Sequence, residues 1–145
     1  MSANAITIEA LLAKARFHST GIGSNLELRL EWQDPLLLLR VTGASSDGLP
    51  DQFTNAVGQA FRTLKPKSAA VDLSGCQSLP SVILAFLVFF QKNAEENGSS
   101  KVVLYGVNPR IQTVIKMIGM LDFFVLLPDE AAMRAWLAKL AAAPQ

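Results

Sequence analysis

Segments with the pattern of β-strands alternate with segments with the pattern of α-helices over the C-terminal two thirds of the chain. The helical segments repeat apolar residues every three or four positions, and short apolar runs lie between them. The expected helices cover residues 50–65, 81–96, 109–118 and 129–141, and the expected strands cover 69–73, 101–107 and 123–127. Two strands joined through a helix pair in parallel, with a crossover that is nearly always right-handed. This order therefore predicts an α/β fold.

A strand hairpin is expected before the first of these units. Residues 26–32 alternate apolar and polar side chains, which is typical of a strand with one buried face and one face in water. A turn at Asp34-Pro35 leads into a second apolar run, 36–42. We expect this run to be the hairpin partner of the first strand, which adds antiparallel pairing to the sheet.

The first part of the chain has a different pattern. Apolar spacing over residues 6–17 predicts a helix, and the Ser- and Gly-rich stretch 18–25 reads as a loop. The chain has 145 residues, half of them hydrophobic, which fits one domain with a single core. We therefore divide it into an N-terminal helical extension, 1–25, and one domain, 26–145.

Charge and motifs argue against nucleic-acid binding and against catalysis. The net charge is +1, with acidic and basic residues interspersed and no basic stripe. The single cysteine, Cys76, excludes an internal disulfide and a cysteine-cluster metal site, and the single histidine, His18, falls in the expected loop. No phosphate-binding glycine motif follows a strand. We expect no enzyme activity, no metal and no cofactor.

Targeting signals are also missing from the pattern. The N-terminal residues lack the basic region and long apolar stretch of a secretory signal. The longest apolar run, 79–90, is interrupted by Ser81 and is shorter than the roughly 20 residues that span a bilayer. We expect a cytoplasmic protein without direct membrane insertion.

The segment 71–90 carries most of the functional information. A buried strand ends in a short polar loop, and Ser81 then opens a helix. A serine at this position either caps free backbone N–H groups or is a phosphorylation site, because the helix N-terminus stabilises added negative charge.

The helix that Ser81 opens is apolar at every position from Val82 to Phe90. A core-facing stripe is expected at Ile83, Phe86, Leu87, Phe90 and Ala94. Leu84 and Val88 then fall near the opposite side. The N-terminal helix, a second copy of the chain or another protein would have to cover them.

The sequence Asp72-Leu73-Ser74-Gly75, the loop after it and the hydroxyl at the helix start resemble the STAS family, the sulfate transporter and anti-sigma factor antagonist domains. Further motifs similar to the family's helix-ending glycine, helix cap and last turn are Glu96-Asn97-Gly98, Asn108-Pro109 and residues 117–121. The resemblance covers roughly residues 26–140 and agrees with the order of elements read from the periodicity.

The resemblance implies a STAS-like fold, with a four- to five-stranded mixed sheet and about four helices mostly on one face, plus the extra N-terminal helix. It also implies a regulatory domain in bacterial signalling that binds another protein, as an anti-sigma factor antagonist does. Its partner would be an anti-sigma factor of the serine-kinase type. Phosphorylation of the hydroxyl at the start of the second helix would switch this binding, and by position that residue is Ser81.

The neighbours of Ser81 depart from the family pattern. Pro80 stands in place of the family's acidic residue, Val82 follows the serine, and Ile83 replaces the usual glycine. Loss of the acid removes a group that such kinases read, so helix capping is a competing role for Ser81. Ser78 is a weaker candidate for modification. The expected partner-binding residues are Ser78, Pro80, Ser81, Val82, Leu84 and Val88.

Two alternatives remain open at this point. The chain could be a constitutive STAS subunit of an ABC-type lipid transporter or of another scaffold, with the apolar helix as a permanent interface and a possible homodimer. A flavodoxin-like enzyme or nucleotide-binding module is the third reading, because parallel sheets often bind ligands beyond their strand ends. No cofactor motif in the sequence supports that third reading.

Overall fold

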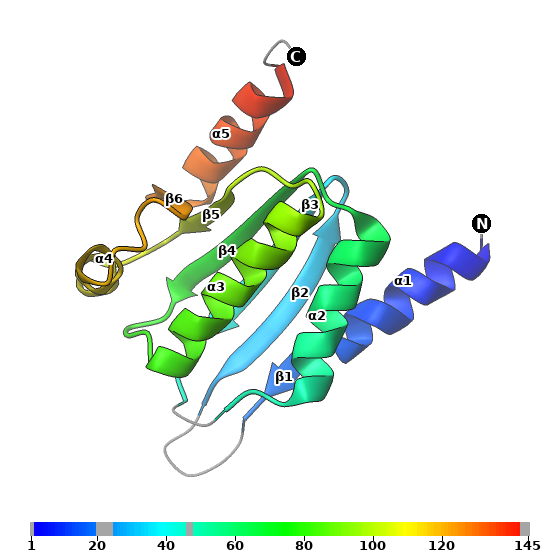
Figure 1. The fold of residues 1–145 in the computed structure, drawn as a ribbon, viewed down its shortest axis with the longest axis horizontal. Coiled ribbons are helices and arrows are strands. Elements are labelled where there is room, and N and C mark those ends of the chain that lie inside the picture. The colour runs from blue at the N-terminus through cyan, green and yellow to red at the C-terminus, as the bar shows by residue number, and fades with distance from the viewer. Residues whose placement is uncertain (1, 20–24, 46–47, 143–145) are drawn as a thin grey trace.

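The computed structural model describes residues 2–19, 25–45 and 48–142, with side chains of the first helix from residue 8 onward. Strands and helices alternate through most of this chain (Figure 1). The strands are β1 (Arg16–His18), β2 (Glu27–Gln33), β3 (Leu36–Thr42), β4 (Ser68–Gly75), β5 (Val102–Tyr105) and β6 (Phe124–Leu127). The helices are α1 (Ser2–Lys14), α2 (Asp51–Leu64), α3 (Ser81–Glu96), α4 (Pro109–Met117) and α5 (Glu130–Ala142).

All six strands of the described chain form one mixed sheet in sequence order, β1-β2-β3-β4-β5-β6. The pairs β1–β2 and β2–β3 are antiparallel, and the pairs from β3 through β6 are parallel. The α/β class, the hairpin and the parallel crossovers expected from the sequence are therefore confirmed. The sheet has more strands than the four or five that we expected.

The additional strand is β1, in a segment for which the sequence predicts the end of a helix and the start of a loop. The helix α1 ends at Lys14, and residues 16–18 pair instead with β2. A strand this short has no readable periodicity, and only its pairing with β2 makes it a strand. The rest of the expected loop, residues 20–24, lies outside the described residues.

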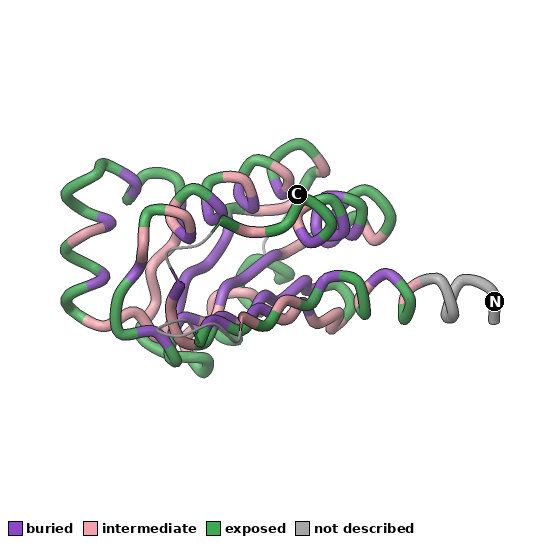
Figure 2. The backbone as a smooth tube through the Cα atoms, turned by 90° about the horizontal axis from the view of Figure 1, so that it is seen from below, coloured by how far each residue is buried: buried purple, intermediate pink, exposed green. Residues whose placement is uncertain are grey.

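The two faces of the sheet are covered unequally. The main core is formed between the sheet and α1, α2, α3 and α4, as Leu11, Phe61, Phe90 and Ile115 illustrate. A smaller core on the other face lies under α5, around the fully buried Met133. Buried residues follow the strands and the inward sides of the helices (Figure 2). Beyond α5, the outer face of β1 and β2 carries polar side chains that are only half-buried or exposed.

Candidate functional site

Three loops meet where the parallel strands β3, β4 and β5 end. Because parallel strands share one carboxyl edge, the loops that lead into α2, α3 and α4 lie side by side there. The middle loop, residues 76–80, carries the chain to Ser81.

Asn108 ties the middle loop to the start of α4. Its Nδ2 donates to the carbonyl oxygens of Cys76 at 3.2 Å and Gln77 at 3.3 Å. Its Oδ1 accepts from the backbone N–H of Ile111 at 2.8 Å, which is the helix cap expected from the sequence. One side chain therefore fixes both the loop before α3 and the helix after β5.

Glycine is required where the strand ends approach one another. Gly106 has φ +72°, and a Cβ there would lie 2.7 Å from Cβ of Ser74 and 2.9 Å from its backbone nitrogen. The backbone N–H of Gly43 donates to the carbonyl of Gly75 at 3.1 Å. These close contacts hold the three loops in one arrangement.

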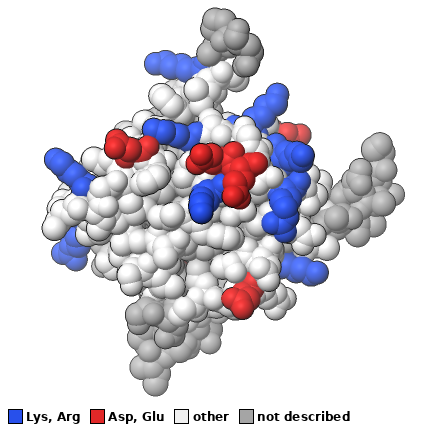
Figure 3. All heavy atoms as spheres, viewed as in Figure 1, with Lys and Arg blue, Asp and Glu red and all other residues white. Residues whose placement is uncertain are grey.

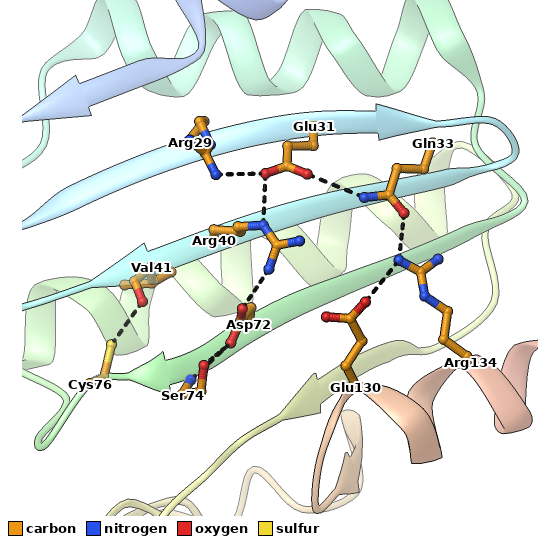
Figure 4. A network of polar contacts seen from close by, with 10 residues as sticks. All are labelled: Arg29, Glu31, Gln33, Arg40, Val41, Asp72, Ser74, Cys76, Glu130 and Arg134. Carbon is orange, nitrogen blue, oxygen red and sulfur yellow. Dashed lines mark hydrogen bonds and ion pairs between the residues drawn. The ribbon is translucent and has the colours of Figure 1, made fainter.

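A charged network lies behind the loops on the outer sheet face (Figure 4). Arg40 bridges two carboxylates, with Nε 2.7 Å from Glu31 and Nη1 2.7 Å from Asp72. Arg29 also donates to Glu31, at 2.9 Å. Asp72 in turn accepts from the backbone N–H of Ser74 at 2.9 Å and from its hydroxyl at 2.6 Å, which orders the end of β4.

The network shifts the ionisation of its members. Burial alone would raise the pKa of Glu31, but hydrogen bonds and the charge of Arg40, with Gln33 and Arg29 as further donors, lower it below its usual value. The hydrogen bond to Glu31 raises the pKa of Arg40. Both groups are therefore held in their charged forms.

The sequence analysis did not find the Arg40–Asp72 pair. Each is the one charged residue in an otherwise mostly apolar strand, and the two are opposite one another in the β3–β4 ladder. A charged residue in a buried run is a readable signal. The pairing itself depends on parallel register, which the sequence does not reveal.

Ser81 is exposed and is the first residue of α3, and Pro80 occupies the N-cap position. The N-cap residue Pro80 makes no side-chain hydrogen bond to the start of this helix. The capping role considered for Ser81 is therefore wrong, because a residue one position inside the helix is not the N-cap. Its hydroxyl lies at the positive end of the helix dipole, where added negative charge is favoured.

The surface of α3 follows the stripe predicted for it. Ile83, Phe86, Leu87, Phe90 and Ala94 are all buried in the main core. Leu84 is half-buried, and Val88 keeps 40% of its surface exposed. The space-filling view shows few charged side chains around the N-terminal half of α3 (Figure 3). This part of the surface is apolar and open within the described chain.

The other expected contact residues have different exposures. Ser78 is exposed, and Pro80 and Val82 are half-buried. Ser81, Leu84 and Val88 recur at the spacing of one helix face, so these three lie along one strip of α3. Ser78 precedes the helix by three residues and belongs to the loop.

Cys76 is buried just behind this surface. Its Sγ lies 3.4 Å from the carbonyl oxygen of Val41. Burial, with a smaller contribution from the charge of Asp72, raises the pKa of the thiol to about 11. Cys76 is therefore a packed small residue, and its thiol stays protonated at neutral pH.

Comparison with known proteins relates the fold to a group of solved structures. No protein-family model matches the sequence, and no curated protein matches it. A serine-to-glutamate variant of RsbS from Moorella thermoacetica superposes with a TM-score of 0.68 at 17% identity, covering 80% of this chain and 98% of that one.

Two further similar structures are of proteins described as anti-sigma factor antagonists. An anti-sigma factor antagonist from Mycobacterium paratuberculosis has a TM-score of 0.55 at 21% identity, over 77% of this chain and 93% of that one. The anti-sigma factor antagonist SpoIIAA, in its unphosphorylated form, has a TM-score of 0.56 at 8% identity, over 80% and 99%. No helix in the described part of the chain has the length and hydropathy to cross a membrane. The chain has the STAS-like fold of the anti-sigma factor antagonists.

Proposed function

We propose that the chain is a non-enzymatic regulatory protein that binds an anti-sigma factor of the serine-kinase type through the start of α3. The observation that carries the proposal is an exposed Ser81 hydroxyl, free of any capping role, at the end of an open apolar helix surface. Such a surface on a small domain is a binding site for another protein.

Phosphorylation of Ser81 would switch this binding. A phosphate adds a charge of about −1.5 to −2 and is well tolerated at a helix N-terminus, so the fold would accept it. The partner surface that contacts Leu84 and Val88 would then have to desolvate a dianion, which opposes docking. SpoIIAA, whose fold this chain shares, is described in an unphosphorylated form, which supports the existence of such a switch in proteins of this shape.

Binding of the cognate kinase to two Ser81 variants tests the proposal. We expect Ser81→Ala to bind within about twofold of the wild type, because the alanine fits the open position. We expect Ser81→Asp to bind at least about tenfold more weakly, which corresponds to about 1.4 kcal/mol. Isothermal titration calorimetry measures both affinities.

Ala135→Asp is the matched control, because Ala135 is also exposed on a helix but lies on α5, which covers the other face of the sheet. It should bind as the wild type does, and intact-mass analysis of the wild type after incubation with kinase and ATP should show one phosphate that Ser81→Ala lacks. Equal binding by Ser81→Ala and Ser81→Asp would reject the switch.

A constitutive scaffold subunit, such as the STAS component of an ABC-type lipid transporter, is the second candidate. Pro80 favours it, because this residue replaces the acid that the family's kinases read and sits half-buried at the N-cap. In that case Val88→Asp would abolish association with a permease–ATPase complex, while Ser81→Asp would leave it unchanged. The anti-sigma proposal predicts that both substitutions weaken binding.

A further inference from the structure

We propose that the open edge of β1 is a second binding surface, which takes up an acidic, extended segment of a partner protein as an added strand of the sheet. The surface is distinct from the one around Ser81. β1 is the first strand of the sheet, whereas α3 follows the fourth. Both surfaces are therefore available at the same time.

The backbone of β1 has hydrogen-bonding groups along its outer side that make no backbone hydrogen bond to the described part of the chain. Ala15 accepts a backbone hydrogen bond from β2 at 3.2 Å, and Ser19 donates one to the residue that precedes β2 at 2.9 Å. Antiparallel strands bond through alternate residues, so Phe17 also faces β2. The N–H and C=O groups of Arg16 and His18 consequently point away from the sheet. These four groups are what an added strand requires.

Hollows flank this edge on both sides. One, of about 400 Å³, is lined by Arg16, Phe17, His18, Glu27, Leu28 and Arg29. The other, of about 270 Å³, is lined by Ala13, Lys14, Arg16, Pro50, Gln52 and Phe53. Successive side chains of an extended peptide point to opposite faces, so hollows on both sides of one strand suit alternate side chains of a bound segment.

The charges around the edge select an acidic segment. Arg16 lies directly opposite Arg29 in the ladder, which places two like charges on one face. No carboxylate of the described residues pairs with Arg16, and Arg29 has a buried Nε without a hydrogen-bond partner among them. Glu27 is the one acid among the residues that line the two hollows, against Lys14, Arg16 and Arg29, and of these Arg29 already pairs with Glu31. Carboxylates on an added strand would neutralise this excess.

The same charges disfavour a second copy of this chain as the occupant. If β1 paired with β1 of another copy around Phe17, Arg16 of each copy would lie opposite His18 of the other. Lys14 would add a further positive charge at each end. Pairing with a second copy would therefore leave each Arg16 without a carboxylate opposite it, so a partner segment of opposite charge fits the edge better.

Titration with short capped peptides tests the proposal on the full chain. The probe is Thr-Glu-Val-Glu-Val-Glu-Thr, and its counterpart has lysine in place of each glutamate. In ¹⁵N-HSQC spectra we expect the acidic peptide to shift the amide signals of residues 16–18 and to slow hydrogen exchange of the Arg16 and His18 amides. We expect the lysine peptide to bind at least about tenfold more weakly.

Substitutions separate the charge from the backbone contribution. Arg16→Glu should weaken binding of the acidic peptide by about tenfold and strengthen binding of the lysine peptide. His18→Pro removes an N–H that faces away from β2. The β1–β2 ladder therefore stays intact, but binding of the acidic peptide should be weaker. His18→Ala removes the same side chain but keeps the N–H, so it is the control and should bind the acidic peptide more tightly than His18→Pro does.

A third comparison does not depend on how the variants fold. Two forms of the acidic peptide carry N-methyl groups on alternate residues: one form on the odd-numbered residues and the other on the even-numbered residues. At least one form should lose binding to the protein, because its N–H groups can no longer donate to β1. The proposal would be overturned if both methylated peptides bound with the affinity of the unmethylated peptide. Equal affinity for the lysine peptide or for the oligonucleotide dT₁₂, or a dimer through β1 without peptide, would do the same. The Ser81 variants should bind the acidic peptide as the wild type does, which keeps this test separate from the proposed function.

Discussion

At the scale of single residues, Cys76 links the candidate site to the pH dependence of stability. Its thiol has a raised pKa of about 11 in the folded chain because of burial, whereas the pKa of a cysteine thiol in an unfolded chain is about 8.5. The folded state therefore favours the protonated thiol. This contribution to stability is complete below the unfolded pKa and is lost as the pH rises toward the folded one.

We expect the free energy of unfolding of the wild type to fall between about pH 8.5 and 10. Cys76→Ala should flatten that fall, although it lowers stability at neutral pH by removing a buried side chain. Urea denaturation followed by circular dichroism at several pH values measures both slopes. Burial also raises the pKa of Tyr105, to about 12, but this tyrosine is present in both proteins and contributes equally to the two slopes. Parallel slopes for the two proteins would contradict the assignment to Cys76.

At the scale of elements, the close approach of the β4 and β5 ends sets the geometry before α3. Gly106→Ala introduces a Cβ into space that Ser74 occupies and also strains a backbone with positive φ. Gly98→Ala is the matched control, because Gly98 has φ +82° but no atom within 4 Å of its added Cβ. We expect Gly98→Ala to cost about 1 kcal/mol, and Gly106→Ala at least about 1 kcal/mol more. Thermal and urea unfolding would show the difference, and equal costs would argue against the contact.

The two sides of α3 allow a second comparison between adjacent residues. Leu87 is fully buried, whereas Val88 is 40% exposed. Leu87→Ala should lower the free energy of unfolding by about 2–5 kcal/mol, because it leaves a cavity. Val88→Ser should change it by no more than about 0.5 kcal/mol.

The same Val88→Ser protein should bind the partner more weakly. This result would distinguish a binding surface from an exposed surface where substitutions have no effect. Unfolding curves and the calorimetric titration described above measure the two effects. A large loss of stability for Val88→Ser, or unchanged binding, would remove Val88 from the binding surface.

At the scale of the whole molecule, the sequence predicted those features that depend on local periodicity. The bounds of α3 and the alternation of β2 follow from the order of apolar residues along one segment, and the cap at Asn108 follows from the local Asn-Pro pair. The strand β1 did not, because three residues acquire strand structure only by pairing with β2.

Features of the candidate site divide in the same way. The exposure of Ser81 follows from its place at a helix start. That it is the first helical residue, and not the N-cap, depends on where the loop ends. The tether from Asn108 to the loop joins residues more than thirty positions apart. Contacts of this kind depend on how strands align across the sheet, which a single sequence does not state.

The direction of the chain at its two ends has a practical consequence. α1 leads into β1 from the amino edge of the parallel strands, and α5 runs back from β6 toward that same edge, so both depart from the side opposite Ser81 (Figure 1). A fluorophore, an affinity tag or a surface tether joined at either end would leave the start of α3 unobstructed. The domain could therefore be immobilised, or carried on a larger protein, and still present that face to whatever diffuses past.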